Sequence, residues 1–202
     1  MITPIIMESD IEVVREKVVI LRKRGEEKVH FDIGDGLFSD LLSISPADLQ
    51  EIDLGGIKLD LHLLVDDPTE YIEECVALKP KRLIAQIERM GSQVRYLEAV
   101  KAYGSGVSGG LALKVETPVE SIEKEALQIA EAVLLLAVPA GTSGSMFDMR
   151  ILAKIKELRE RCDGIIIVDG GINPETYKLA IDVGADEVGA NSSYWKGLFN
   201  HG

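Results

Sequence analysis

Segments that favour strands alternate with segments that favour helices along the whole of this 202-residue chain. Short apolar runs such as 2–7 and 132–138 are typical of strands, and each is followed by a segment with helical periodicity. The same strand–helix unit recurs about eight times without a change in composition, which predicts a parallel sheet in an α/β fold. Eight is also the number of units that closes a (β/α)8 TIM barrel.

A closed barrel and an open doubly wound sheet both fit this pattern. We favour the barrel because the units have similar lengths and because no Gly-x-Gly-x-x-Gly motif follows the first strand. We expect one domain over residues 1–202, with a shortened last helix in 193–202. The expected strands are 2–7, 29–36, 59–65, 82–88, 109–115, 132–138, 165–168 and 187–190. The first expected helix begins after a cap at Ser9 or Asp10 and ends at Gly25. The other expected helices are 45–54, 69–78, 92–103, 119–130, 148–162 and 174–183.

The bulk properties narrow the class of function. A net charge of −12 argues against nucleic acid or an anionic membrane as the main partner. No apolar run approaches the length of a membrane span, and the N-terminus lacks the shape of a signal peptide. The cysteines, Cys75 and Cys162, indicate a reducing compartment rather than a disulfide framework. We therefore expect a cytoplasmic enzyme or binding protein.

Two histidines in strand-like segments each lie two residues from an aspartate. His30 and Asp32 share one face of their strand, His62 lies in the next strand, and Asp169 ends the seventh. In a barrel these side chains would meet at the mouth formed by the C-terminal strand ends. Each residue alone is most simply a core or turn residue, but burying four unpaired polar groups together is costly. The set predicts a site for one divalent transition metal, Zn²⁺, Fe²⁺, Mn²⁺ or Co²⁺, rather than Mg²⁺ or Ca²⁺.

Glycine-bearing loops follow the last three expected strands. Loops at these strand ends commonly hold phosphate in such barrels, because glycine lets backbone N–H groups approach an anion. Each loop alone could be an ordinary connector, but their joint positions predict a phosphorylated substrate. The candidate phosphate-binding residues are Gly141, Thr142, Ser143, Gly144, Gly170, Gly171, Asn191 and Ser192.

These residues carry a family resemblance. The segments His30-Phe-Asp32-Ile-Gly-Asp-Gly, Asp60-Leu-His62-Leu and Val168-Asp169-Gly-Gly resemble the ribulose-phosphate 3-epimerase family, and the likeness extends over nearly the whole chain. The resemblance implies a barrel of the ribulose-phosphate-binding type. It implies a metal held by His30, Asp32, His62 and Asp169, with His62 also facing the substrate, and a phosphate held by the glycine-bearing loops.

The resemblance also implies a reaction. The family inverts carbon 3 of a ketose phosphate, interconverting D-ribulose 5-phosphate and D-xylulose 5-phosphate through an enediolate. Asp32 and Asp169 would be the acid/base pair, one taking a proton from one face and the other returning one to the opposite face. A metal ion at the ketone oxygen would act as a Lewis acid.

The chain departs from the family around the substrate. The usual Pro-Ser of the first strand is Pro4-Ile5, and the usual mouth methionines correspond to Gly34, Leu64 and Leu136. Other altered positions are Pro139-Ala140 and Thr142-Ser143 in the sixth loop, Gln86 in place of His, Lys114-Val115 in place of Asn-Pro, and Asn191 in place of Gly. Two alternatives follow: an epimerase for a six-carbon ketose phosphate such as allulose 6-phosphate, or a non-catalytic paralogue that binds metal or phosphate. A stunted last helix also leaves room for a homo-oligomer.

Overall fold

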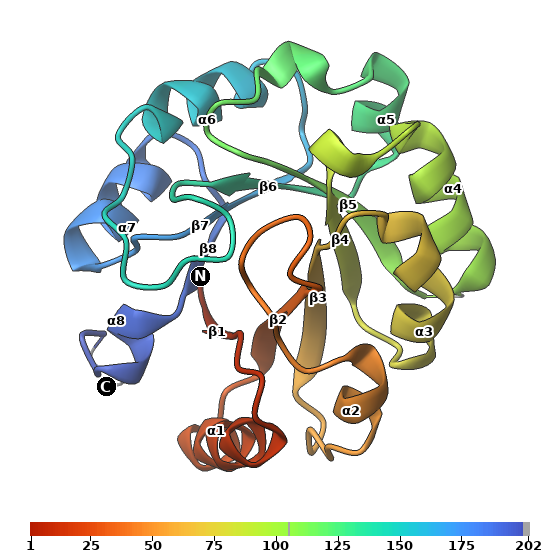
Figure 1. Cartoon of the computed structure of the whole chain (residues 1–202). Helices are drawn as coiled ribbons and strands as arrows, with labels where there is room; N and C mark the ends of the chain where they lie inside the picture. The colour runs from red at the N-terminus through yellow and green to blue at the C-terminus, as the bar shows by residue number, and fades with distance from the viewer. Residues whose placement is uncertain (105, 200–202) are drawn as a thin grey trace.

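The computed structural model describes residues 1–104 and 106–199, and within them eight parallel strands close into a barrel in chain order (Figure 1). The predicted (β/α)8 barrel is confirmed, and the open sheet is excluded. Pairing of the first strand with the last, which aligns Thr3 with Gly189, closes the sheet. The strands are β1 Ile2–Ile6, β2 Lys28–Gly34, β3 Lys58–Leu64, β4 Arg82–Gln86, β5 Ser108–Leu113, β6 Ala132–Leu136, β7 Ile165–Asp169 and β8 Glu187–Ala190.

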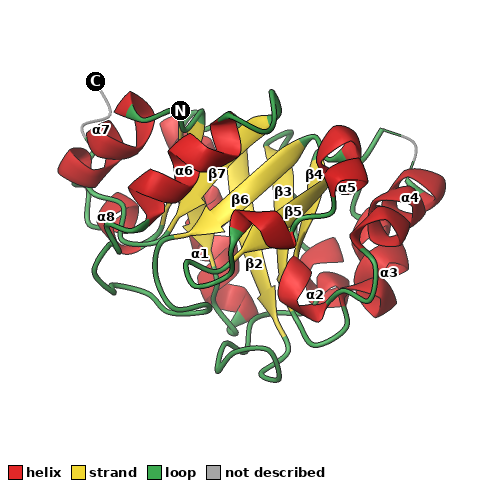
Figure 2. Ribbon diagram, turned by 90° about the horizontal axis from the view of Figure 1, so that it is seen from above, coloured by secondary structure: helices red, strands yellow, loops and turns green. Residues whose placement is uncertain are grey.

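Helices surround the barrel on the outside (Figure 2). Asp10 begins the first helix by accepting a hydrogen bond from the Glu12 backbone, and Gly25 ends it in a left-handed conformation with φ of 71°. The helices are α1 Ile11–Arg24, α2 Pro46–Gln50, α3 Ile72–Ala77, α4 Gln93–Tyr103, α5 Lys124–Ile129, α6 Ile151–Arg159, α7 Pro174–Asp182 and α8 Ser192–Trp195, with 3₁₀ turns η1 Pro68–Tyr71, η2 Ile87–Arg89 and η3 Val119–Ser121.

Several helices are shorter than the sequence predicts. The expected helix 119–130 is a 3₁₀ turn followed by α5, with extended backbone at Ile122 between them. The expected helix 69–78 likewise begins as the turn η1. The spacing of apolar residues does not distinguish a continuous α-helix from a 3₁₀ turn, because a 3₁₀ turn also brings residues i and i+3 to one side.

The strands alternate between two buried environments. Val29, Phe31 and Ile33 pack in the large apolar layer beneath the helices. The alternate residues of β2 face the barrel interior, where Ile84, Leu134 and other apolar side chains form a second cluster. Val29, Phe31 and Ile33 point outward to the helices, so His30 and Asp32, which alternate with them, point into the barrel.

The end of the barrel where the strands begin is filled by a charged network. Lys28 of β2 and Arg82 of β4 both contact Asp60 of β3 and Glu187 of β8. Arg82 is fully buried, and its Nη2 lies 2.9 Å from Asp60 Oδ2 and 2.7 Å from Glu187 Oε2. Burial opposes the charge on Arg82, but the two carboxylates outweigh it and raise the pKa of the guanidinium. The network joins strands that are distant in sequence.

The short last helix is held by aromatic side chains. Trp195 donates its indole N–H to the Ile5 carbonyl at 2.8 Å, and the Tyr194 hydroxyl lies 2.7 Å from a Glu26 carboxylate oxygen. Phe199 packs edge-on against Tyr177. The expected shortening of this helix is confirmed, and the end of the expected segment, 200–202, lies outside the described residues. Within the described part of the chain, no helix combines the length and apolar character needed to cross a membrane.

Replacing Arg82 by Met should destabilise the fold by about 3–5 kcal/mol, because it leaves Asp60 and Glu187 to share one cation, Lys28, and so leaves an uncompensated buried charge. Urea unfolding followed by circular dichroism measures this loss. The matched control is Arg161→Met, whose guanidinium pairs with Glu120 and Glu157 at the surface and should cost less than about 1 kcal/mol. Equal losses in the two variants would show that the network does not support the barrel.

Candidate metal centre

Four ligand-type side chains from three strands meet inside the barrel. Strand register places Asp32 of β2 beside His62 of β3, and Asp169 is the last residue of β7. One potential ligand atom from each of His30, Asp32, His62 and Asp169 lies within 4.8 Å of all the others, and all four residues are buried. The structure thus brings together the residues that the sequence singled out.

Asp32 is the centre of this cluster. Its Oδ1 lies 2.9 Å from Nδ1 of His62 and 3.2 Å from Nε2 of His30. Burial alone would raise the pKa of Asp32, but hydrogen bonds from both imidazoles and their charge hold it well below its usual range. Asp32 is therefore ionised, and both imidazole rings are oriented by one carboxylate.

The other titratable groups respond differently to the same burial. Burial and the nearby negative charge of Asp32 raise the pKa of Asp169 to about 7. Burial also lowers the pKa of His62, whereas for His30 the hydrogen bond and charge of Asp32 outweigh burial and raise the pKa. Two carboxylates in one buried space repel each other, and a cation between them would relieve that repulsion.

The donor set fits a divalent transition metal. Two imidazole nitrogens and two carboxylate oxygens are ligands that Zn²⁺, Fe²⁺, Mn²⁺ and Co²⁺ share. Asp32 and Asp169 also line a pocket in the barrel mouth, so the carboxylate side of the cluster faces this pocket. A cation held here would have protein donors on one side and the pocket on the other, as catalytic metal sites do.

The pocket walls come from the predicted loops. Residues 141–144 after β6, Gly170 and Gly171 after β7, and Asn191 and Ser192 after β8 all line it. Apolar walls are supplied by Ile5, Leu64 and Leu136. The pocket is small, with a cavity volume of about 30 Å³.

Two of the glycines are also required by loop packing, which sequence reasoning missed. Gly171 has φ of +66°, and a Cβ there would lie 2.5 Å from the Phe147 backbone nitrogen. Gly141 has φ of +72°, and its Cβ would lie 2.5 Å from Ser39 Oγ in the loop after β2. Larger residues would push the loops apart, so substitutions at these glycines do not isolate an effect on an anion.

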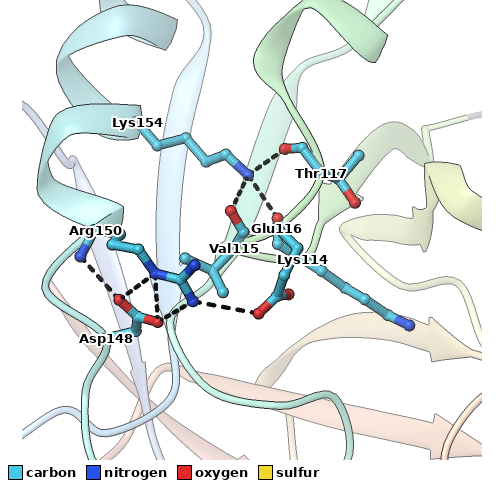
Figure 3. A network of polar contacts seen from close by, with 7 residues as sticks. All are labelled: Lys114, Val115, Glu116, Thr117, Asp148, Arg150 and Lys154. Atoms are coloured by element: carbon cyan, nitrogen blue, oxygen red, sulfur yellow. Dashed lines mark hydrogen bonds and ion pairs between the residues drawn. The ribbon is translucent and has the colours of Figure 1, made fainter.

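Lys154 fastens another loop at the mouth. Its ammonium group reaches from α6 and donates to the carbonyl oxygens of Lys114, Val115 and Thr117 after β5 (Figure 3). Lys114 Nζ lies 4.1 Å from the centre of the Phe38 ring, and Phe38 belongs to the second apolar cluster, which also contains Ile84 and Leu134. A signal was present in the sequence, since Lys154 falls on the apolar stripe of Ile151, Ile155 and Leu158.

Gln86 is the second residue whose place sequence reasoning missed. It ends β4, is fully buried, and its amide nitrogen lies 2.8 Å from Nε2 of His62. The sequence marked Gln86 only as a departure from a family pattern. Its contact with His62 depends on the pairing of β3 with β4, which aligns His62 with Ile84 two residues earlier on the same inner face.

Known proteins share this sequence pattern. The model of the ribulose-phosphate 3 epimerase family matches residues 1–195. The chain belongs to the ribulose-phosphate 3-epimerase family. Ribulose-phosphate 3-epimerase of Bacillus subtilis is 29% identical over 96% of this chain and 91% of its own length. The enzyme of the same name from Treponema pallidum is 30% identical over 97% of this chain and 91% of its own length.

Solved structures with lower sequence identity share the fold. Phosphoribosyl anthranilate isomerase from Thermus thermophilus matches with a TM-score of 0.63 and 18% identity, over 96% of this chain and 88% of that one. A mutant tryptophan synthase α-subunit from Pyrococcus furiosus matches with a TM-score of 0.67 and 11% identity, over 97% of this chain and 88% of that one. At these identities the likeness concerns the barrel alone.

The purified protein should bind about one transition-metal ion per chain, measured by elemental analysis after incubation with Zn²⁺, Mn²⁺, Fe²⁺ or Co²⁺. His62→Ala removes a potential ligand and should weaken binding more than about a hundredfold, beyond the loss expected for an outer residue. Tyr96→Phe is the matched control, because it removes a buried hydrogen bond to the Leu83 carbonyl away from the cluster. Equal affinity in both variants, or no metal in the wild type, would contradict this assignment.

Proposed function

We propose that this chain is a metal-dependent epimerase that inverts carbon 3 of a ketose phosphate, with D-ribulose 5-phosphate and D-xylulose 5-phosphate as the first pair to test. The observation that carries the proposal is the buried cluster of two carboxylates and two imidazoles, whose two carboxylates line the pocket formed by the loops. Family membership supports the same reaction, because the relatives are named for it.

Asp32 and Asp169 are the proposed acid and base. Inversion requires one group to remove the proton on carbon 3 and another to return a proton to the opposite face. The two carboxylates belong to β2 and β7, which are not neighbours in the barrel, and both reach the pocket. Carboxylates on different sides of a substrate meet that requirement. After each turnover, the carboxylate that gained a proton loses it to solvent and the one that gave up its proton regains one, which restores the starting state.

His30, Asp32, His62 and Asp169 would hold the metal ion. When bound, a divalent cation supplies Lewis acidity that makes a carbon-bound proton beside a carbonyl group easier to remove. His30 and His62 contribute neutral nitrogen donors, and their contacts with Asp32 fix the direction of both rings. The aspartates thus have two tasks, and a test of either must measure metal content as well.

The phosphate would lie in the glycine-bearing loops after β6, β7 and β8. Backbone N–H groups bind phosphate without positive side chains, which suits a chain of net charge −12. Asn191 links two of these loops, since its side-chain nitrogen lies 3.3 Å from Ser143 Oγ. The proposed contacts come from Gly141, Thr142, Ser143, Gly144, Gly170, Gly171, Asn191 and Ser192, all of which line the pocket.

The residues of the apolar pocket walls differ from the family pattern, so a different sugar is a second candidate substrate. Ile5, Leu64 and Leu136 place aliphatic groups where the family resemblance places a hydroxyl and methionines. A six-carbon ketose phosphate such as allulose 6-phosphate is therefore a second candidate substrate. A non-catalytic role would leave the cluster and loops in place without turnover.

Metal-loaded wild-type protein should exchange the carbon 3 proton of a five- or six-carbon ketose phosphate in D₂O, followed by NMR. Asp32→Asn and Asp169→Asn should each lower epimerisation at least about a hundredfold, because each removes a proton-transfer group. Asp182→Asn, on the exposed end of α7, makes the same chemical change elsewhere and should retain activity. Wild-type protein with full metal content and no exchange on any of these sugars would favour the non-catalytic role.

A ketose phosphate should bind at least about tenfold more tightly than the same ketose without phosphate, since one hydrogen bond to a charged group supplies about 1.4 kcal/mol or more. Asn191→Ala should reduce this difference by removing a polar contact between the loops. Titration calorimetry with both sugars measures it, and inorganic phosphate should compete. Equal affinity for both sugars would contradict the phosphate site.

A further inference from the structure

Gln86 and His62 form a buried pair in which only one end of the Gln86 amide is hydrogen-bonded within the described part of the chain. Nε2 of Gln86 lies 2.8 Å from Nε2 of His62, while Oε1 of Gln86 is buried without a hydrogen-bond partner among the described residues. Both side chains are fully buried. A buried amide oxygen without a hydrogen bond costs free energy. Because this oxygen lies beside a potential metal ligand, it can serve as an acceptor for that ligand when a metal is bound.

The pair fixes which nitrogen of His62 carries a proton. A neutral imidazole has one N–H and one lone pair. When the Gln86 nitrogen donates to Nε2 of His62, that atom is the acceptor, so the proton lies on Nδ1 and is donated to Asp32 at 2.9 Å. In this arrangement Nδ1, the nitrogen that faces the cluster, has no lone pair to offer.

A cation in the cluster needs the other tautomer. The proton of His62 must then lie on Nε2, and an acceptor must face it. A half-turn of the Gln86 side-chain amide exchanges its nitrogen for its oxygen at nearly the same position, since the two atoms differ little in size. The turn gives Oε1 a partner and frees Nδ1 as a donor to the cation.

We propose that Gln86 is a positioning residue that selects the tautomer of His62, its amide nitrogen facing Nε2 in the metal-free protein and its amide oxygen facing Nε2 in the metal-loaded protein. This inference rests on the proposed metal site. Glutamine suits both states because it carries a donor and an acceptor on one planar group. Residues that orient a ligating histidine in this way affect metal affinity by about 10–100-fold.

Two substitutions separate the functions of the amide. Gln86→Met keeps a side chain of similar length but removes both polar atoms, so it should weaken Zn²⁺ binding about 10–100-fold. Gln86→Glu places a carboxylate acceptor at Nε2, so this nitrogen of His62 should carry a proton even without metal, in addition to the Nδ1 proton donated to Asp32. Competition with a chelator measures the Zn²⁺ affinity of each variant, without any need for turnover.

Nitrogen-15 NMR of the histidine side chains provides the second readout, because the two tautomers have distinct ring-nitrogen shifts. In the wild type, His62 should change from the Nδ1–H form to the Nε2–H form on Zn²⁺ loading. In Gln86→Glu, Nε2 of His62 should carry a proton before loading, together with Nδ1. A wild-type His62 that carries its proton on Nε2 in both states would overturn the proposal, even if Gln86→Met failed to fold.

Gln93→Met is the matched control. Gln93 is a buried glutamine outside the cluster, and its amide contacts the Ser121 carbonyl and the Glu123 backbone nitrogen. This variant should lose stability in urea but retain the Zn²⁺ affinity of the wild type. Equal Zn²⁺ affinity in Gln86→Met and the wild type would overturn the role of Gln86 alone. Absence of Zn²⁺ binding by the wild type would overturn this inference and the proposed function together.

Discussion

Closure of the sheet is the constraint on which the rest of this molecule depends, because it encloses every second side chain of each strand. Along β4 the inward positions are Arg82, Ile84 and Gln86, and they meet three different surroundings. Arg82 joins the ion network, Ile84 packs in the apolar interior cluster, and Gln86 contacts His62. Along β4, charge therefore lies at the end where the strands begin, an apolar residue follows, and the contact with the candidate metal centre lies at the mouth.

The ion network and the candidate metal centre differ in how they are balanced. In the ion network, two cationic side chains, Lys28 and Arg82, face two carboxylates, Asp60 and Glu187, so the charges cancel within the protein. At the mouth, two carboxylates meet two imidazoles, and burial raises the pKa of Asp169 to about 7 while Asp32 stays ionised. The first arrangement is balanced in charge and serves the fold. The second would become balanced with a cation, and its two carboxylates lie beside the pocket.

Much of this organisation was predictable from sequence, and the limits have physical causes. Strand alternation put His30 and Asp32 on one face, and barrel closure then predicted that they meet His62 and Asp169, as the structure shows. The role of Gln86 was not predictable, because it depends on a contact across strands and on the rotation of an amide. The packing of Gly171 against Phe147 was missed for a similar reason, since it depends on how two loops approach each other. Local patterns predict which face a residue occupies, and long-range register decides which atoms touch.

The same distinction bears on how this chain has diverged from its family. In the buried cluster, the proposed ligands act through particular side-chain atoms, so a change of residue removes the donor itself. In the glycine-bearing loops, the proposed phosphate contacts come chiefly from backbone N–H groups, which many residue types supply equally well. The loops can therefore vary at Thr142, Ser143 and Asn191 while the cluster beneath them stays intact. The walls formed by Ile5, Leu64 and Leu136 belong to neither case. These side chains make no proposed bond to the metal or the phosphate, so they can vary without loss of either proposed site. Their size and shape would instead determine which sugar fits in the pocket.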